Sequence, residues 1–203
     1  TDFYDEYPRD VKVFSGEYAS HPISGMNLPQ ANTLGGALAE AAFLTGVERN
    51  ADVVVLASYA PLFARVGYAQ WSPDMIWFDD SDVYLTPNYY VQKLFANHRG
   101  TYTIPLQKQD VKLRKEGIYV SAAVDAQGEI ILKLVNTNHR EYALMLEDAD
   151  GLAVRTTGQM WTLRGTGEMP EDRPEVSAVT EETAEIDGCV FIPAQSLVVI
   201  RYQ

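Results

Sequence analysis

The pattern of apolar residues changes about halfway along the chain. Before residue 100, short apolar runs alternate with stretches in which apolar residues recur every three or four positions. After residue 101, apolar and polar residues alternate in several short runs that are separated by turn residues. The first pattern is typical of strands alternating with helices, and the second is typical of an antiparallel sheet. We therefore expect two architectures in one chain of 203 residues.

The first half begins with a predicted strand and two predicted helices. Residues 11–14 form a short apolar run that predicts a buried strand, which opens into a loop at Glu17. Asn32 is a capping residue before a stretch with helical spacing, which predicts a helix. Asn50 is a second capping residue and predicts another helix, which Pro61 should end.

The pattern then repeats. Residues 75–78 predict the next strand. Thr86 followed by Pro87 is typical of a helix start, and Gly100 is placed to end that helix. Two strand-helix units are too few to close a parallel barrel, which needs eight strands. Residues 1–100 therefore have the pattern of the tail end of a barrel.

The second half predicts an antiparallel β-sandwich. Residues 118–124 and 130–135 flank a turn at Gln127-Gly128, as in a hairpin. The acidic stretch 165–175 contains proline and is expected to be a surface loop. Further strands are expected at residues 142–146, 154–163 and 196–202.

Composition argues against several classes of partner. The formal net charge of −12 disfavours nucleic acid and anionic membranes, because phosphate groups are bound by clustered Lys and Arg. No apolar run reaches the roughly 20 residues that span a bilayer. Cys189 is the only cysteine, and the three histidines lack ligand spacing, so neither a metal site nor a cofactor is expected. The compartment stays open, with a secreted or periplasmic location favoured over a cytoplasmic one.

Glu17 is the strongest candidate for a catalytic residue. It follows the small residue Gly16 at the end of a predicted strand, where barrel enzymes place their catalytic groups. From the residues alone, a second explanation is equally good: Glu17 caps a helix or pairs with an arginine on a loop.

Several motifs, in order along almost the whole chain, resemble a single enzyme family. The first is Gly16-Glu17-Tyr18-Ala19. The others lie at residues 32–34, 37–44, 48–50, 58–63, 71–74, 86–92 and 193–197. Together these segments are similar to the α-L-arabinofuranosidases of glycoside hydrolase family 51.

The resemblance implies both a fold and a mechanism. Residues 1–100 would supply strands 7 and 8 of a TIM (β/α)8 barrel with their helices. Residues 101–203 would form most of an antiparallel jelly-roll β-sandwich beside that barrel. Glu17 would be the nucleophile of a retaining, exo-acting enzyme that removes terminal arabinofuranosyl groups from plant polysaccharides.

Such a mechanism needs a second carboxyl group about 5 to 5.5 Å from the first. In the family this group is a Glu directly after an Asn, and the present sequence contains no Asn-Glu pair. The isolated chain is therefore expected to be inactive without the missing N-terminal barrel segment. Its unpaired strands and helix faces also predict self-association.

Three further residues are candidates for substrate binding. Tyr18 and Trp71 have aromatic faces that suit a sugar ring, although packing between barrel and sandwich explains Trp71 equally well. Asp74 precedes the second predicted strand and is a candidate contact to the sugar. Trp77 and Trp161 are expected in the core.

The alternative function belongs to a different class of protein. In that hypothesis the sandwich is a non-catalytic carbohydrate-binding or structural module. It predicts an exposed aromatic platform on the sheet, whereas the enzyme hypothesis depends on Glu17 at a strand end.

Overall fold

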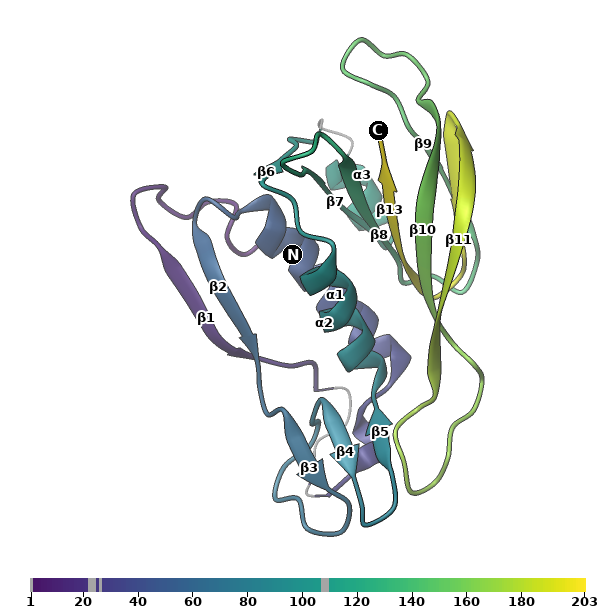
Figure 1. The fold of residues 1–203 in the computed structure, drawn as a ribbon. Helices are drawn as coiled ribbons and strands as arrows, with labels where there is room; N and C mark the ends of the chain where they lie inside the picture. The colour runs from purple at the N-terminus through teal and green to yellow at the C-terminus, as the bar shows by residue number, and fades with distance from the viewer. Residues whose placement is uncertain (1, 22–24, 26, 107–109) are drawn as a thin grey trace.

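The computed structural model describes residues 2–21, 25, 27–106 and 110–203. The elements form three layers (Figure 1). A two-stranded sheet lies on one side, the helices α1 and α2 lie in the middle, and a six-stranded sheet lies on the other side. A small three-stranded sheet lies at one end of the helices.

The first layer and α1 form a parallel strand-helix-strand unit. Its elements are β1 (Val13–Tyr18), α1 (Leu34–Arg49) and β2 (Val54–Tyr59), and β1 pairs in parallel with β2. A strand and a helix are thus present where the sequence predicted them, but the strand lies later than residues 11–14 and includes Glu17, which was expected in a loop, and Asn32 is not the cap of the helix. The cap of α1 is Thr33, whose side chain accepts a hydrogen bond from Gly36 N at 3.1 Å.

The prediction of a second helix after Asn50 is wrong, because residues 54–59 form a strand. Asn50 ends α1 instead: its side-chain amide donates to Gly46 O at 2.9 Å. Three consecutive β-branched residues, Val53 to Val55, then favour an extended backbone. The neighbouring strand β1 supplies the hydrogen-bond partners that stabilise it.

The predicted strand at residues 75–78 is present, but its partners differ from those expected. It is β4 (Ile76–Phe78), which pairs with β3 (Phe63–Arg65) and β5 (Val83–Leu85) in the small sheet. The strand beside β1 is β2. The second strand-helix unit therefore consists of β2 and α2, with the small sheet inserted between them, and no closed barrel is formed by the part of the chain that the structure describes.

The helix α2 (Pro87–Asn97) confirms the predicted start at Thr86-Pro87. The Thr86 side chain accepts a hydrogen bond from Tyr89 N at 3.1 Å. The helix ends at Asn97, and Gly100 has a different role from the one predicted. A Cβ at Gly100 would lie 2.3 Å from the Ala123 Cβ, so glycine allows the chain to pass close to the large sheet.

The second half forms an antiparallel β-sandwich, as predicted. The large sheet has the order β11-β10-β13-β8-β7-β6, and all its neighbouring strands are antiparallel. The short pair β9–β12 forms the second sheet. The bounds of these strands and of a short helix are β6 (Tyr102–Thr103), α3 (Asp110–Lys115), β7 (Ile118–Val124), β8 (Ile130–Asn136), β9 (Tyr142–Met145), β10 (Arg155–Gly165), β11 (Ser177–Asp187), β12 (Cys189–Ile192) and β13 (Ser196–Tyr202).

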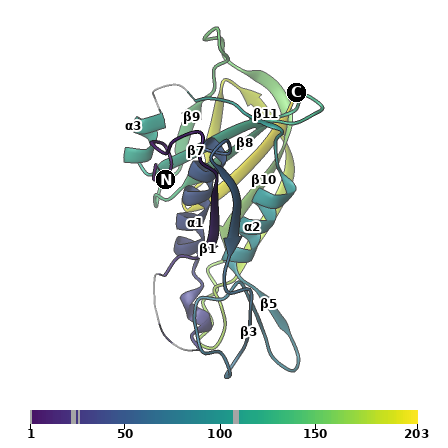
Figure 2. The ribbon, with the colours of Figure 1, turned by 90° about the vertical axis from the view of Figure 1, so that its left-hand side faces the viewer.

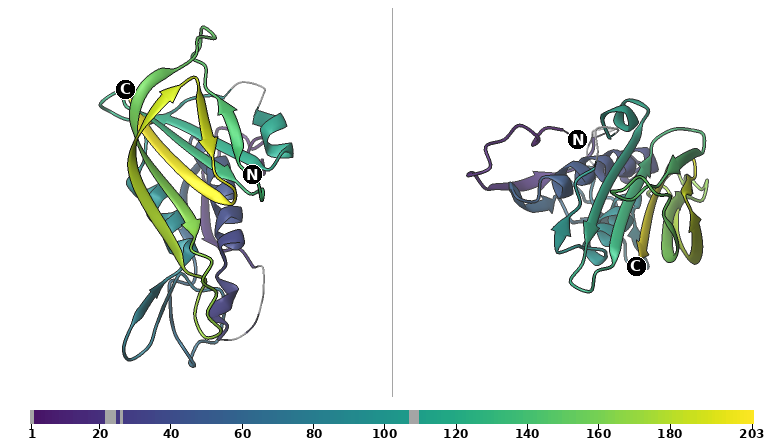
Figure 3. Two further views of the ribbon diagram at one scale, coloured as in Figure 1. Left: turned by 90° about the vertical axis from the view of Figure 1, so that its right-hand side faces the viewer. Right: turned by 90° about the horizontal axis from the view of Figure 1, so that it is seen from above.

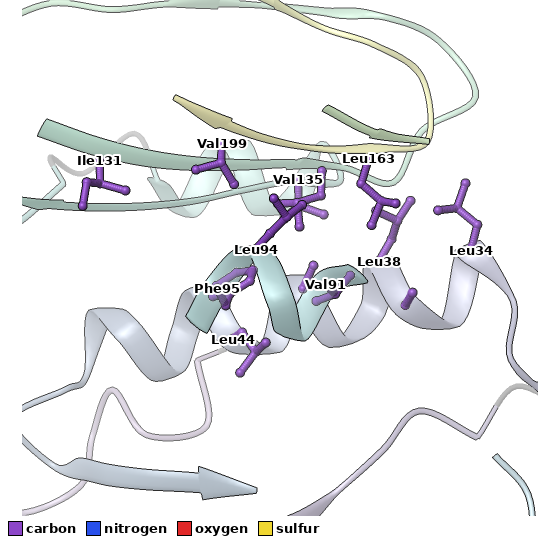
Figure 4. Packing of buried hydrophobic residues seen from close by; sticks show 13 residues of the cluster. Leu34, Leu38, Leu44, Val91, Leu94, Phe95, Ile131, Val135, Leu163 and Val199 are labelled. Carbon is purple, nitrogen blue, oxygen red and sulfur yellow. The ribbon is translucent and has the colours of Figure 1, made fainter. Parts of the chain in front are cut away.

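The large sheet carries a hydrophobic core on each face. On one face, Ile131, Val135 and Val199 pack against side chains of α1 and α2, including Leu38 and Leu94 (Figure 4). On the other face, apolar residues of β7, β8 and β13 pack against β9 and β12. Figure 3 shows these layers from two further directions. The central strands β7, β8 and β13 of the large sheet are therefore buried on both faces, whereas most residues of the edge strands β6 and β11 are exposed.

A buried ion pair fastens the helical layer to the large sheet. Lys133 on β8 donates to the Glu48 carboxylate on α1, and its side chain is 1% exposed. The other Glu48 oxygen accepts a hydrogen bond from Ser121 Oγ at 2.6 Å. The Lys133 ammonium also lies 4.9 Å from the Phe95 ring centroid. These contacts join α1, α2, β7 and β8.

Candidate active site

Glu17 lies exposed near the carboxyl end of β1, where the regular pairing with β2 is interrupted. Ser15 pairs with Ala57 and Tyr18 with Tyr59, so β1 has one more residue than β2 in this interval. Such a bulge changes the direction of a side chain and is common next to active sites. Glu17 therefore stands at an irregular strand end that leaves its carboxylate open to solvent.

Backbone hydrogen bonds bring the segment with Asp74 to the same end of the pair. Ala60 N, just after β2, donates to Tyr18 O at 3.3 Å, and Met75 N donates to Pro61 O at 3.2 Å. Asp74 therefore lies beside the segment that follows β2. In Figure 2 the carboxyl ends of β1 and β2 point toward the end of the molecule that holds the small sheet.

Trp71 lies on the same inserted segment. Its ring centroid is 5.6 Å from that of His21, in an edge-to-face arrangement. Leu28 N donates to Ser72 Oγ at 2.8 Å, which holds the segment against the chain that follows β1. Because Trp71 is 51% exposed, a large part of its ring is available for contact.

Asp74 is an unusual carboxyl group. It is 3% exposed, and its Oδ2 atom has no hydrogen-bond partner among the described residues. Burial raises its pKa to about 6, because a charged carboxylate is poorly solvated in the interior. Asp74 thus has hydrogen-bonding capacity that the described fold leaves unused.

Tyr18 is placed differently from the other candidates, because its side chain packs on the helical layer. Its ring centroid lies 5.3 Å from that of Phe43 and 5.9 Å from that of Tyr59. Its hydroxyl donates to Gln92 Oε1 at 2.6 Å. Burial and the nearby Glu40 carboxylate raise the pKa of this hydroxyl.

The sequence analysis missed Glu40, a buried carboxyl group beneath this end of the strand pair. Glu40 lies within α1 and is 3% exposed. Its Oε1 atom accepts hydrogen bonds from Ser20 N at 2.8 Å, Ser20 Oγ at 3.0 Å and Asn88 Nδ2 at 2.8 Å. A glutamate on the apolar face of a predicted helix was the available signal, because a carboxyl group is rarely buried without a specific partner.

The two other tryptophans were expected in the core, and the structure buries Trp77 fully and Trp161 only partly. Trp77 is fully buried, as predicted, and donates to Asn32 Oδ1 at 2.9 Å. Trp161 is half-buried beside His98, with a centroid distance of 4.2 Å. Within the described ranges, no group of three or more His, Cys, Asp and Glu could hold a metal ion, and no helix is long and apolar enough to cross a membrane.

Comparison with solved structures defines the class of fold. An arabinose-bound family 51 α-L-arabinofuranosidase matches with a TM-score of 0.76 and 28% identity, over 99% of this chain and 34% of the other. A Thermotoga maritima α-L-arabinofuranosidase matches with a TM-score of 0.70 and 19% identity, over 96% of this chain and 44% of the other. The fold is thus one that occurs in glycoside hydrolases.

The family is defined by sequence. The family model described as α-L-arabinofuranosidase C-terminal domain matches residues 16–192. The chain belongs to this family, which is the C-terminal portion of family 51 α-L-arabinofuranosidases, as the motifs of the sequence predicted.

Two relatives show how much of a longer protein is covered. Alpha-L-arabinofuranosidase 1 of Arabidopsis thaliana is 34% identical over 194 residues, which is 91% of this chain and 28% of the relative. An extracellular exo-α-L-arabinofuranosidase of Streptomyces chartreusis is 51% identical over 105 residues, which is 51% of this chain and 12% of the relative. The chain therefore spans less than a third of either relative.

Proposed function

We propose that this chain is the C-terminal part of a retaining, exo-acting α-L-arabinofuranosidase, with Glu17 as its nucleophile. The observation that carries the proposal is an exposed glutamate at the bulged carboxyl end of a parallel strand, in a chain of this family. The substrate would be a terminal arabinofuranosyl group of a plant polysaccharide or oligosaccharide.

We propose that the two strand-helix units belong to a larger TIM barrel, as its strands 7 and 8. Phe14 on β1 is 59% exposed, and Leu56 on β2 is 60% exposed. Apolar side chains on neighbouring strands are costly to leave in water, so a covering segment is favoured. The missing N-terminal barrel segment would provide that cover, and in its absence the open pair favours self-association.

The proposed boundary between barrel segment and sandwich lies near residue 100. The chain leaves α2 at Asn97 and joins the large sheet at Tyr102, where β6 begins. Residues 1–100 would then form the barrel segment. Residues 101–203 would form a jelly-roll β-sandwich that supports the barrel through α1 and α2.

In the proposed mechanism, a Glu17 carboxylate oxygen attacks the anomeric carbon and forms a glycosyl ester. The bond to the leaving alcohol breaks at the same time, and that alcohol takes a proton from a second carboxyl group. The same second group then removes a proton from water, which hydrolyses the ester. Because the sequence holds no Asn-Glu pair, this acid/base residue would come from the rest of the barrel, and the chain alone would be inactive.

The three other candidates would have separate roles toward the sugar. Trp71 would offer its exposed ring face to the sugar. Asp74 is buried, so its Oδ2 atom would accept a hydrogen bond from a sugar hydroxyl only when the segment that covers it moves aside. Tyr18 would support the site from the helical side, since its ring and hydroxyl are engaged by Phe43 and Gln92.

The alternative of a carbohydrate-binding sandwich has less support. It needs several exposed aromatic rings on one sheet face. Among the described residues of the sandwich, the exposed aromatic residues are Tyr102 and Phe191, which lie on β6 and β12 in different sheets. They do not form a common platform.

The test uses the longer protein that carries this chain, hereafter the full-length protein. Its activity would be measured as phenol released from an aryl α-L-arabinofuranoside. Glu17→Gln is expected to lower kcat by about 10³-fold or more, because the nucleophile is lost. Glu182→Gln, an exposed glutamate on β11, is the matched control and should leave kcat unchanged. Equal activity of the two variants would refute the proposal.

A further inference from the structure

The buried glutamate Glu40 has no assigned role in the proposed chemistry, yet it is the centre of a hydrogen-bond network beneath the site. It lies in the middle of α1, and no Lys or Arg pairs with it among the described residues. Transferring a carboxyl group into the interior is costly unless its hydrogen bonds are satisfied. Of its two oxygens, Oε1 accepts three hydrogen bonds and Oε2 has no partner among the described residues, so the contacts of Oε1 are the ones that offset the cost of burial.

One arm of the network holds the chain just after the proposed nucleophile. Ser20 stands three residues after Glu17, and both its backbone N–H and its hydroxyl donate to Glu40 Oε1, at 2.8 and 3.0 Å. A single oxygen atom therefore fixes both the backbone and the side chain of this residue. The end of β1 is anchored to α1 at this point.

A separate hydrogen bond holds Tyr18, the residue that directly follows the proposed nucleophile. The Tyr18 hydroxyl donates to Gln92 Oε1 at 2.6 Å, and burial and the nearby Glu40 carboxylate raise the pKa of this hydroxyl. The residues at positions one and three after Glu17 are thus both held by the helical layer, Tyr18 through Gln92 on α2 and Ser20 through Glu40 on α1. The stretch that directly follows Glu17 is therefore restrained at Tyr18 and at Ser20.

A second arm leads toward Asp74. Asn88 Nδ2 donates to Glu40 at 2.8 Å, and Asn88 Oδ1 accepts from Asn32 Nδ2 at 2.8 Å. Asn32 Oδ1 in turn accepts from Trp77 Nε1 at 2.9 Å, three residues after Asp74. One continuous chain of buried bonds therefore connects the two segments that carry the candidate carboxyl groups.

We infer that Glu40 is a positioning residue, which fixes the carboxyl end of β1 and thereby the attacking oxygen of Glu17. The inference rests on the proposed function and adds a residue that does not contact the sugar. Positioning has large effects on rate, since a displacement of about 1 Å at a reacting group can cost about 10²-fold.

The required feature is the accepting oxygen of Glu40. Burial raises the pKa of Glu40 to about 7, against the effect of its hydrogen bonds from Ser20 and Asn88. A neutral carboxyl group can still accept at Oε1. Glutamine keeps this carbonyl oxygen, whereas leucine has a similar size and no acceptor.

The test compares Glu40→Leu, Glu40→Gln and Glu48→Gln in the full-length protein. Glu48 lies on the same helix but bonds to Lys133 and Ser121 of the sandwich, so it is a matched control. Glu40→Leu is expected to lower kcat per folded molecule by about 10- to 100-fold with KM within about 3-fold. Glu40→Gln should restore most of this loss, and Glu48→Gln should lower the melting temperature without changing kcat.

The opposite pattern would overturn the inference. If Glu40→Leu and Glu48→Gln lose stability alike and keep the same kcat per folded molecule, Glu40 only supports the fold. If Glu40→Leu does not fold, Ser20→Ala decides instead, since it removes the hydroxyl that donates to Glu40 Oε1. Its kcat should fall by about 3- to 10-fold, and an unchanged kcat overturns the inference. Failure of the proposed function is seen separately, as an unchanged kcat in Glu17→Gln.

Discussion

The strand pair β1–β2 and the large sheet are built from similar apolar residues but differ in what covers them. Leu134 and Val199 of the large sheet are fully buried between the helices and the pair β9–β12. Phe14 and Leu56 of the strand pair are mostly exposed. The central strands β7, β8 and β13 of the large sheet are thus covered on both faces by this chain, whereas the strand pair lies on the helical layer on one side (Figure 1).

The difference indicates which part of the chain depends on a partner. A sheet covered on both faces gains its stability from contacts that this chain supplies. A parallel strand pair needs cover on both faces, because parallel sheets are almost always buried. The strand pair is therefore expected to be covered by another segment of a longer protein, and Glu17 lies near the carboxyl end of β1.

The largest expected loss of stability comes from removing the ion pair between Glu48 on α1 and Lys133 on the large sheet. Lys133→Ala should lower the free energy of unfolding by about 3 to 5 kcal/mol, because it leaves the Glu48 carboxylate without its cation. Urea denaturation would measure this loss. The double variant Lys133→Met with Glu48→Gln should recover most of it, and a loss below about 1 kcal/mol in Lys133→Ala would contradict the account.

The same chemical change in the two regions should have different effects. In the 203-residue chain, Leu134→Ala should cost about 2 to 5 kcal/mol, because it opens a cavity. Leu56→Ala should cost less than about 0.5 kcal/mol in this chain, since the side chain is exposed. In the full-length protein the cost of Leu56→Ala should rise above about 1.5 kcal/mol. An equal, small cost in both proteins would show that nothing covers β2.

A smaller effect should appear as a pH dependence of stability at the contact between α2 and the sandwich. Burial, together with the positive charges of Arg201 and Lys133, lowers the pKa of His98 to about 4. As the pH falls below about 6.5, His98 becomes protonated in the unfolded chain but stays neutral in the folded chain. The contribution of His98 to stability is full above pH 6.5, and it is lost as the pH falls toward 4.

The contribution of His98 has to be isolated, because Glu40 and Asp74 act in the opposite direction. Their raised pKa values favour the folded state at low pH and destabilise it as the pH rises through about 7 and 6. The wild-type chain and His98→Phe should therefore be compared. Between pH 7 and 5, the wild type should lose about 1 to 2 kcal/mol relative to His98→Phe, as measured by urea denaturation. If the stability of the two proteins changes with pH in the same way, the pKa of His98 does not differ between the folded and the unfolded chain, which would contradict the prediction.

Local signals predicted the elements that follow local rules. Thr86-Pro87 caps α2, and Gly128, with φ +86°, allows the turn between β7 and β8. The strand β2 was predicted as a helix because Asn50 resembles a helix cap, whereas its pairing with β1 is a contact across about 40 residues. The edge strand β11 was not predicted, since Glu181, Glu182 and Glu185 give it the composition of a loop; charges on an edge strand prevent further pairing.

The candidate site could be predicted only as far as its sequence motifs allowed. Glu17 was proposed as the nucleophile because it stands at a predicted strand end within a family motif. The hydrogen-bond network of Glu40 was not predicted, because its members come from segments that are distant in the sequence: Ser20, Asn88, Asn32 and Trp77. Such a network depends on how α1 and α2 pack, which spacing in the sequence does not reveal.

The central claim is that this chain supplies the nucleophile of the enzyme, and the most direct test is to identify the residue that carries the sugar during turnover. The full-length protein would be mixed with an aryl α-L-arabinofuranoside that has a good leaving group, quenched rapidly, digested and analysed by mass spectrometry. We predict one pentosyl unit on the peptide that contains Glu17, and none on that peptide in Glu17→Gln. A pentosyl unit on another carboxylate, or one that persists in Glu17→Gln, would contradict the account.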